Sequence, residues 1–493
     1  MNPEDILEAL DEQQRAAAEA ILGPVCILAG AGAGKTRTIT HRIAYGLAAG
    51  YYSANRVMAL TYTNRAAGEL RARLRSLGYP GVSVKTFHAA ALSQLQFFWP
   101  QYAGIPAPQV LESKAKALSE AATTLKLRLD TTGIRSMAAE IEWRKFSMLS
   151  LDDYAAVAEA RSAALDLTPE QNLEIQRLYE ENKVGLNRLD WEDVLILNLG
   201  LLRAESRALE HVHQQYRFYT VDEYQDISPL QHALLDEWIG DRSELCVVGD
   251  PNQTIYSFTG ATSKYLQEFS SRFPEAKVVE LNHNYRSTEE IVQVANRVID
   301  GFTNMDALVS SGEHGPAPMV LADETVSDEA LRVAADIRKK LEQGVPAREI
   351  AVLYRVNGQS EAFESALTKF GIDYQVRGGE RFFSRQEIQM AIQLVRAESA
   401  APRNKSMVQV VSDIARSLGW SLQPPTEEGV VREKWEALNS FVHIADELPE
   451  DSTIVDFAKE IEERVRSQHE PQRAAVTLST IHAAKGLEWD VVY

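Results

Sequence analysis

The sequence predicts an α/β protein whose functional residues follow the strands of a parallel sheet. VCILAG (25–30) is an apolar run that enters a glycine-rich turn and then an amphipathic helix from about Lys35. VMALTYT (57–63) is a second apolar run, and its polar end leads into helical sequence, while VSVKTFHAA (82–90) is a third short strand. Alternation of strand, loop and helix is typical of an α/β fold.

Further strand signals divide into two groups. YRFYTVDE (216–223) and ELCVVGD (244–250) continue the first α/β domain. KVVELNHNYRS (277–287), EIAVLYRV (349–356) and AAVTLSTIHAAKG (474–486) form a second one. The chain stops at WDVVY, which is itself a strand signal, so we expect a truncated protein whose last residues lie within a sheet.

Two stretches with long charged helical patterns and few strand signals interrupt these domains, which predicts helical insertions. A chain of 493 residues is too long for one core, and about three or four domains are expected. We expect the following segments: first α/β domain, 1–88 and 215–279; its helical insertion, 89–214; second α/β domain, 280–378 and 474–493; its short helical insertion, 379–473.

The composition is that of a soluble globular protein. There are 51 Lys and Arg against 70 Asp and Glu, a formal net charge of −19, and 45% of the residues are hydrophobic. This balance excludes a uniformly basic nucleic-acid coat, so a polyanion would have to meet a local patch. Cys26 and Cys246 lie in apolar runs and are interpreted as core thiols, which suits a reducing cytoplasm. The N-terminus lacks a signal sequence, and no apolar run reaches the roughly 18 residues of a membrane span.

The turn after the first strand predicts a phosphate-binding loop. Backbone N–H groups of such a turn point at phosphate oxygens at a helix N-terminus. Lys35 can reach the terminal phosphates, and the Thr36 hydroxyl is placed for Mg²⁺. Ala29 breaks the strict pattern G-x-x-x-x-G-K-[ST], and Lys35 excludes a dinucleotide-binding G-x-G-x-x-G. The alternative is a tight strand-to-helix turn. The expected nucleotide-binding residues here are Ala29, Gly30, Ala31, Gly32, Ala33, Gly34, Lys35, Thr36 and Arg37.

VDEYQD (221–226) supplies the acidic partner at the end of another apolar strand. Asp222 would hold the Mg²⁺ shell, and Glu223 would accept a proton from the water that attacks the γ-phosphate. Taken alone, such a pair would more often be a solvated turn. The 187 residues from Lys35 to Asp222 far exceed an ordinary loop and independently require an inserted domain.

The order of these segments resembles the UvrD/Rep/PcrA family of superfamily 1 DNA helicases, and the likeness covers nearly the whole chain. The segment DPNQTIYSFTGA (250–261) resembles the second UvrD-type paralogue of actinobacteria. The resemblance implies two RecA-like P-loop motor domains, each with a helical insertion, that use ATP and Mg²⁺ to move along single-stranded DNA from 3′ to 5′. The segments that carry it are LDEQQRAA, AGAGAGKTRT, TYTNRAA, KTFHA, VDEYQD, VVGDPNQTIYSFTGA, LNHNYRS, AVLYRVNGQSEAFE, GGERFFSRQEI and TLSTIHAAKGLEWD.

The resemblance also implies roles around the nucleotide. Gln14 would read adenine and Tyr285 would stack on it, while Gln253 would sense the γ-phosphate. Arg286 would act as an arginine finger, because a guanidinium stabilises the charge on the transferring phosphoryl group. Glu488 belongs to the same implied nucleotide-binding set. Without the motif, Arg286 would be interpreted as a surface ion pair and Tyr285 as a core ring.

By the same resemblance, the residues at several strand ends bind DNA. Aromatic faces stack on bases without sequence preference, and each stacked base contributes roughly 1–3 kcal/mol, which suffices for an acidic protein. For any single ring the alternative is an ordinary core aromatic. The rings implied to stack are Tyr62, Phe87, Tyr256 and Phe258; the residues implied to face phosphates and sugars are Thr61, Thr63, Asn64, His88, Thr480 and His482.

Three departures from the family pattern affect the prediction. Thr259 replaces a usual Arg, and Phe258 replaces a usual Trp and so lacks the indole donor. Motif VI, with a second arginine finger, would lie beyond Tyr493, so we expect this chain to bind nucleotide and DNA but to hydrolyse ATP poorly. The second insertion is shorter than its counterpart in the family, so the sequence does not identify the residues that contact duplex DNA.

Alternatives to a helicase remain. One is a P-loop phosphotransferase, although Glu223 and the aromatic DNA segments speak against it. Another is a non-catalytic DNA-binding fragment, and a nuclease domain could follow the last residue. DNA-repair proteins are the expected protein partners, without a particular one being indicated.

Overall fold

The computed structural model folds into two compact units. The first comprises 1–128, 137–163 and 167–319, and the second comprises 129–136, 164–166 and 320–493. This division is coarser than the six predicted segments, which stay predictions, and the boundaries predicted at 378/379 and 473/474 lie outside the described residues. The structure describes residues 2–111, 113–162, 165, 167–302, 305–312, 314–377, 382–400, 405–423, 425, 430–446, 448–449, 452–466 and 475–493.

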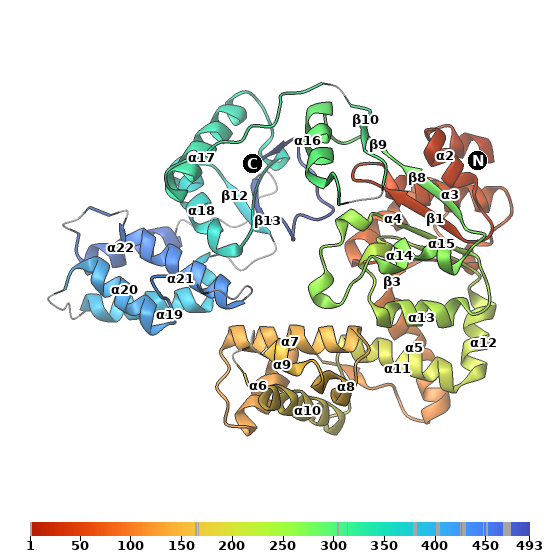
Figure 1. Cartoon of the computed structure of the whole chain (residues 1–493), viewed down its shortest axis with the longest axis horizontal. Helices are drawn as coiled ribbons and strands as arrows, with labels where there is room; N and C mark the ends of the chain where they lie inside the picture. Colours follow the sequence, from red (N-terminus) through yellow and green to blue (C-terminus); the bar gives the residue numbers. More distant parts are fainter. Residues whose placement is uncertain are drawn as a thin grey trace. The chain divides into compact units, whose positions relative to one another are not determined.

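The first unit contains a parallel sheet of six strands in the order β3-β2-β6-β7-β1-β8 (Figure 1). Its central strands are apolar and buried, as expected for a parallel sheet that is covered on both faces. The strands expected for the first α/β domain are all present, and β8, which was expected to begin the second α/β domain, pairs with β1 in this same sheet. Their bounds are β1 (Val25–Ala29), β2 (Val57–Thr61), β3 (Ser83–Thr86), β6 (Phe218–Val221), β7 (Leu245–Gly249) and β8 (Lys277–Leu281).

Separate apolar cores cover the two faces of this sheet. Helices α2, α3 and α4 contribute to the core that contains Cys246, and helices α5, α11 and α13 contribute to the core that contains Cys26. Both cysteines are buried free thiols, as predicted. The helices of this unit outside the insertion are α1 (Pro3–Leu7), α2 (Glu12–Glu19), α3 (Lys35–Ala48), α4 (Asn64–Ser76), α13 (Pro229–Ile239), α14 (Lys264–Gln267), α15 (Phe269–Arg272) and α16 (Glu289–Ile299).

Hydroxyl side chains cap the N-termini of several helices that follow strands. The Thr63 hydroxyl accepts the N–H of Ala66 at the start of α4, and the Thr86 hydroxyl accepts the N–H of Ala89 at the start of α5. Such caps satisfy backbone donors that have no partner within the helix. The polar residues at the strand ends therefore fix where each loop turns into a helix.

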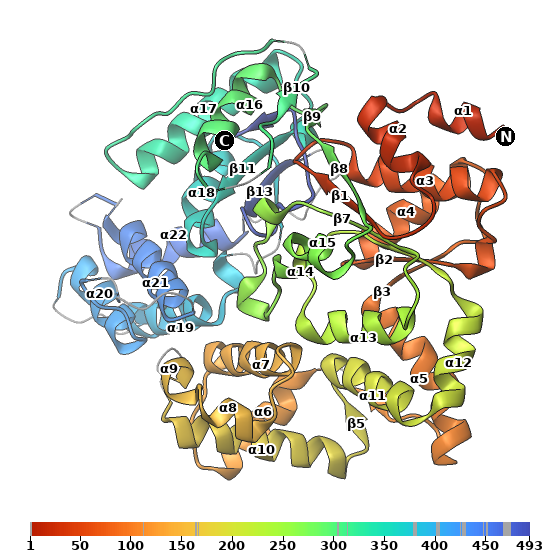
Figure 2. The same cartoon turned by 45° about the vertical axis from the view of Figure 1, so that its right-hand side comes forward.

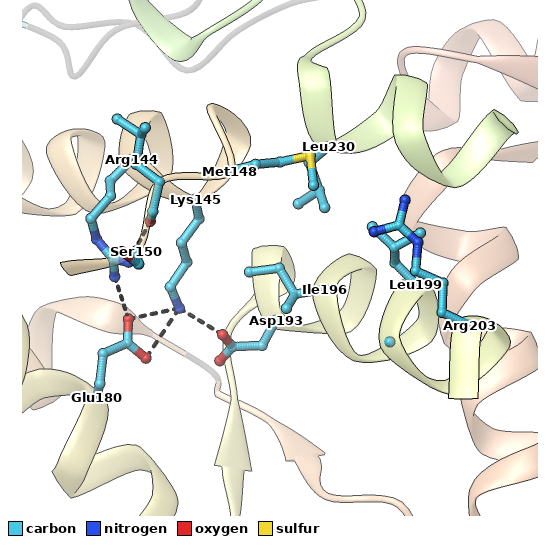
Figure 3. Close-up of a pocket in the computed structure, with 12 residues that line it drawn as sticks. Arg144, Lys145, Met148, Ser150, Glu180, Asp193, Ile196, Leu199, Arg203 and Leu230 are labelled. Carbon is cyan, nitrogen blue, oxygen red and sulfur yellow. Dashed lines mark hydrogen bonds and ion pairs between the residues drawn. The ribbon is translucent and has the colours of Figure 1, made fainter. Parts of the chain in front are cut away.

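The predicted first insertion is helical. A buried ion cluster holds it together, in which Asp190 accepts hydrogen bonds from Lys145 at 2.7 Å and from Lys183 at 2.9 Å. Lys145 also pairs with Glu180 and Asp193 beside a cavity of about 460 Å³ (Figure 3). The elements are α5 (Phe87–Ala103), β4 (Gln109–Val110), α6 (Lys114–Thr124), α7 (Thr131–Phe146), α8 (Leu151–Ala155), α9 (Ala158–Ser162), α10 (Pro169–Gly185), β5 (Arg188–Leu189), α11 (Trp191–Ala204) and α12 (Ser206–Gln215).

The second unit contains a parallel sheet of four strands in the order β12-β13-β11-β14, with α17 and α18 packed on it (Figure 2). Helices α19 to α22 form a core of their own. Among the described residues, no helix combines the length and the apolar character that crossing a membrane requires. The elements are α17 (Val326–Glu342), β11 (Ile350–Tyr354), α18 (Ser360–Lys369), β12 (Tyr374–Arg377), α19 (Gln386–Ala400), α20 (Met407–Ser417), α21 (Val430–Asp446), α22 (Ile454–Arg466), β13 (Val476–Thr480) and β14 (Val491–Val492).

The ion cluster gives a prediction for stability. Burial by itself raises the pKa of Asp190, but the charges of Lys145 and Lys183 outweigh it and lower that pKa overall. Replacing Asp190 by Ala removes one of the three carboxylates that the two buried ammonium groups share, while Glu180 and Asp193 remain. This loss should lower the free energy of unfolding by about 1–3 kcal/mol. Urea denaturation would measure this loss. As a control, Glu174→Ala removes an exposed ion pair with Arg177 and should change stability by less than about 1 kcal/mol.

Candidate nucleotide and DNA site

The loop between β1 and α3 has the geometry of a phosphate cradle. Gly34 precedes the first residue of α3 with a φ of 79°, and Gly32 has a φ of 71°, a region that favours glycine. The turn leads directly into the N-terminus of α3, where free backbone N–H groups and the helix dipole favour an anion. Ala29 lies at the buried end of β1, so its departure from the strict pattern falls in the strand and not in the turn.

Lys35 lies near enough to Asp222 for its charge to act on that carboxyl group. They belong to α3 and to the end of β6, and β7 separates β6 from β1 in the sheet. Asp222 is only 6% exposed. Burial and then the charge of Glu223 raise the pKa of Asp222 to about 7, while the positive charge of Lys35 acts in the opposite direction. Lys35 also donates from Nζ to the carbonyl of Ala29 at 3.4 Å.

Glu223 has a strained backbone at the carboxyl end of β6. Its φ is 52° and its ψ is 43°, in the left-handed region that non-glycine residues rarely adopt. Its N–H donates to Oδ1 of Asp222 at 3.0 Å, and its carbonyl accepts the N–H of Asp226 at 2.9 Å. Strained residues of this kind cluster at functional sites because the surrounding structure holds them in place.

Gln253 belongs to the same hydrogen-bonded region. Its Nε2 donates to Oδ2 of Asp250 at 2.7 Å, and the N–H of Asp250 donates to Oε1 of Gln225 at 3.1 Å. Neither Asp250 nor Gln225 was predicted from the sequence as a site residue. The available signal was their position, since each is a polar residue just after a buried strand.

The segment that carries Tyr285 and Arg286 is bonded to the phosphate loop. Asn284 donates from Nδ2 to the carbonyl of Ala31 at 2.7 Å, and the N–H of Tyr285 donates to the carbonyl of Gly32 at 3.0 Å. Oδ1 of Asn284 accepts the N–H of Arg286 at 2.9 Å. Arg286 is thus exposed beside the loop, and Asn284, which the sequence analysis missed, holds the turn that presents it.

The residues expected to contact adenine are held by other parts of the protein. Gln14 is buried and donates from Nε2 to the carbonyl of Ala33 at 3.1 Å, so here it supports the phosphate loop. Tyr285 is 49% exposed, and its hydroxyl donates to the carboxylate of Asp11. Burial and this bond raise the pKa of Tyr285 to about 12. Arg37 donates to the carbonyl of Ala9, and the adenine contacts stay predictions.

Three of the predicted stacking rings lie together. The rings of Tyr62 and Tyr256 stack with centroids 5.1 Å apart and an interplanar angle of 17°. Phe258 is 60% exposed, and the centroid of its ring lies 6.3 Å from the centroid of the Tyr256 ring. The hydroxyl of Thr259, which replaces the usual Arg, donates to the carbonyl of Tyr256 at 2.8 Å and so stabilises this turn. An exposed ring beside a stacked pair offers a face to a base.

The prediction for Phe87 is wrong. Phe87 is 3% exposed and stacks on Trp238 of α13 with centroids 5.9 Å apart, so its faces are occupied within the core. Thr61 requires a similar correction, because it is buried and its hydroxyl donates to the carbonyl of Thr63 at 3.0 Å. Thr63 and Asn64 are exposed, and their predicted contacts with the DNA backbone stay predictions.

His88 lies among aromatic rings. Its ring meets those of Phe146 and Trp191 edge to face, with centroid distances of 6.1 and 6.0 Å. Burial and then the charge of Lys114 lower the pKa of His88 to about 4. A neutral imidazole at pH 7 offers no positive charge to a phosphate, so a DNA contact by His88 would depend on hydrogen bonding.

The remaining candidates belong to the second unit. Thr480 is buried at the end of β13, and its hydroxyl accepts the N–H of Ala483 at 3.2 Å, which does not favour the predicted DNA contact. His482 follows in the next turn, where Nδ1 lies 3.3 Å from a guanidinium nitrogen of Arg355. Glu488 is exposed before β14. The roles of His482 and Glu488 stay predictions.

A glycine-rich loop with its lysine near the buried Asp222 and the adjacent Glu223, at the carboxyl ends of parallel strands, defines the class of P-loop nucleoside triphosphatases. Comparison with known proteins gives the family. Residues 10–274 match the model of the UvrD/REP helicase N-terminal domain, and residues 279–428 and 421–493 match the UvrD-like helicase C-terminal domain. The chain belongs to the UvrD/Rep helicase family.

Individual relatives agree with this assignment. The chain is 42% identical over 507 residues to the ATP-dependent DNA helicase UvrD2 of Mycobacterium tuberculosis (strain ATCC 25618 / H37Rv), covering 99% of this chain and 72% of the relative. It is 30% identical over 423 residues to the ATP-dependent DNA helicase PcrA of Bacillus subtilis (strain 168), covering 84% of this chain and 56% of that relative. The predicted family, α/β fold and enzyme class are confirmed.

The environment of His88 predicts a pH dependence of stability. The unfolded chain protonates His88 near its ordinary pKa of 6.5, whereas the folded chain resists protonation down to about pH 4. Stability from this group is therefore lost as the pH falls from about 6.5 to 4. His88→Phe should reduce the loss of unfolding free energy between pH 7 and pH 5 by about 1–2 kcal/mol.

Urea denaturation at the two pH values would measure this difference. The matched control is His211→Phe, which replaces an exposed imidazole that also contacts aromatic rings. The loss of unfolding free energy between pH 7 and pH 5 should be smaller in His88→Phe than in this control. Equal pH dependence in His88→Phe and the parent would contradict the assignment.

Proposed function

We propose that this chain is an ATP-dependent translocase and helicase that steps along single-stranded DNA. The observation that carries the proposal is the segment from Asp250 to Phe258. Its first part bonds Gln253 into the acidic site, and its last part presents an exposed ring beside the stacked pair of Tyr62 and Tyr256. A change at the nucleotide would therefore reach the base-stacking surface within one short stretch of chain.

Different residues of the first unit would bind the phosphates, accept the proton and stabilise the transferring phosphoryl group during ATP hydrolysis. The loop N–H groups and Lys35 would bind the phosphates, and Glu223 would accept the proton of the attacking water as the bond between the β- and γ-phosphates breaks. Arg286, exposed beside Gly32, would stabilise the charge on the transferring phosphoryl group. The products would be ADP and inorganic phosphate.

Thr36 and Asp222 fit a magnesium ion. Mg²⁺ prefers hard oxygen ligands, which a hydroxyl and a carboxylate supply. The raised pKa of Asp222 shows that burial penalises its charged form, and a nearby cation would relieve this penalty. When bound, the ion would neutralise charge on the phosphates. No cluster of three or more His, Cys, Asp or Glu suited to a metal occurs among the described residues, so the phosphates would complete the shell.

Single-stranded DNA is the proposed track, with junctions between single and double strands as substrates. Phe258 and the pair of Tyr62 and Tyr256 would stack on bases, and the exposed Thr63 and Asn64 would face the backbone. Movement from 3′ to 5′, a cytoplasmic location and partners in DNA repair follow from the family resemblance and are parts of the proposal.

The first test concerns the phosphate loop. Lys35→Ala removes the cation that contacts the terminal phosphates, so ATP hydrolysis stimulated by single-stranded DNA should fall to background. DNA binding without nucleotide should stay nearly unchanged, because the rings lie in other segments. A phosphate-release assay and fluorescence anisotropy with a labelled oligonucleotide would measure both. Equal loss of both activities would count against separate sites, and transfer of phosphate to an acceptor would indicate a phosphotransferase.

The second test separates the exposed ring from the buried one. Phe258→Ala should weaken binding of a single-stranded oligonucleotide by about 5- to 150-fold, since one stacked base contributes roughly 1–3 kcal/mol. The free energy of unfolding of the Phe258→Ala variant should stay unchanged, because the Phe258 ring is exposed. Phe87→Ala is the contrasting variant and should lower the free energy of unfolding by about 3–5 kcal/mol. Unchanged DNA affinity in Phe258→Ala would contradict the stacking role.

A further inference from the structure

We propose that Gln225 is a positioning residue for ATP hydrolysis, which orients the carboxylate of Glu223 and links it to Gln253. This inference rests on the proposed function, in which Glu223 accepts the proton of the attacking water. It adds a role for a side chain that lies between the acidic pair and the segment leading to the DNA rings.

The amide of Gln225 is bonded on both of its ends. It is fully buried, with 0% exposure. Its Nε2 donates to Oε2 of Glu223 at 2.5 Å, and its Oε1 accepts the N–H of Asp250 at 3.1 Å. Nε2 also lies 3.4 Å from Oδ2 of Asp226. Because the amide has distinct donor and acceptor ends, these bonds fix its orientation.

The amide of Gln225 lies close against the end of β7. A Cβ added to Gly249 would collide with Oε1 of Gln225 and would lie 2.9 Å from Cδ2 of Leu266. The hydrogen of the following N–H, on Asp250, points at the same oxygen. Gln225 is therefore held against the backbone of β7, from which it reaches back to Glu223.

Asp250 extends the connection to Gln253. Oδ2 of Asp250 accepts Nε2 of Gln253 at 2.7 Å, and Oδ1 accepts the N–H of Asn252 at 2.9 Å. A continuous path of hydrogen bonds thus runs from Glu223 through Gln225 and Asp250 to Gln253. A displacement of Gln253 would move Asp250 and alter the bond that Gln225 makes to Glu223.

The bond to Glu223 matters because a general base acts only from the correct position. The Glu223 backbone is strained, but its long side chain can rotate about bonds that the backbone does not fix. A misplacement of about 1 Å at such a group costs on the order of 100-fold in rate. Loss of Gln225 should therefore lower kcat, whereas KM for ATP, set by the phosphate loop, should change little.

The experiment compares two variants of the full chain with a matched control. Gln225→Met keeps the length of the side chain but removes both hydrogen bonds. Gln225→Glu keeps an acceptor for Asp250 and replaces the donor by a negative charge facing Glu223. Both should lower DNA-stimulated kcat by at least about tenfold, with KM for ATP within about threefold. Gln176→Met, at a buried amide bonded to Arg144 and Asn172 in the insertion, should keep the parent kcat.

A double-mutant cycle separates positioning from a general loss of structure. Residues that act as a unit are non-additive, so Gln225→Met in a Glu223→Gln background should cause less than about a twofold further loss of kcat. Gly249→Ala places a Cβ against the same amide and should therefore reproduce the loss of kcat. This variant replaces Gln225→Met in the experiment if Gln225→Met does not fold. Binding of a fluorescent ADP and urea denaturation would verify that each variant is intact.

An unchanged kcat in folded Gln225→Met, or an equal loss in both backgrounds, would overturn the inference. A parent chain that binds DNA and nucleotide but never turns over ATP would instead overturn the proposed function on which the inference rests. These two failures are therefore distinguishable.

Discussion

The nucleotide site depends on one electrostatic constraint, the burial of Asp222 at the end of β6 near the charge of Lys35. A carboxylate out of contact with water is costly unless cations or hydrogen bonds compensate it. Here Lys35 and the N–H of Glu223 favour the charged form, while burial and the charge of Glu223 oppose it. The opposing effects leave a carboxylate whose negative charge a bound cation would compensate further.

Side chains from distant segments shape the glycine-rich loop around this carboxylate. A Cβ at Gly34 would lie 2.7 Å from Nε2 of Gln14, and one at Gly32 would lie 2.6 Å from Nδ2 of Asn284. A Cβ at Gly30 would collide with Leu308. The alternation of glycine and alanine therefore accommodates neighbouring side chains, and the loop shape depends on residues more than 250 positions away.

Much of the fold and the centre of the site could be predicted from the sequence. Apolar runs with polar ends locate buried parallel strands because burial on both faces requires continuous hydrophobicity, and the loop and acid pair carry local patterns. Phe87 was predicted wrongly because its burial depends on Trp238, which follows some 150 residues later. Gln225 and Asn284 were missed since their importance comes from bonds to other segments, which no local pattern records.

The central claim is that one magnesium nucleotide binds between the phosphate loop and the acid pair. A crystal structure of the chain with Mg²⁺ and a non-hydrolysable ATP analogue tests it most directly. The account predicts the terminal phosphates on the N–H groups of Gly32 to Thr36, with the metal between Thr36 and Asp222. A nucleotide bound away from this loop, or a metal bound without Asp222, would contradict it.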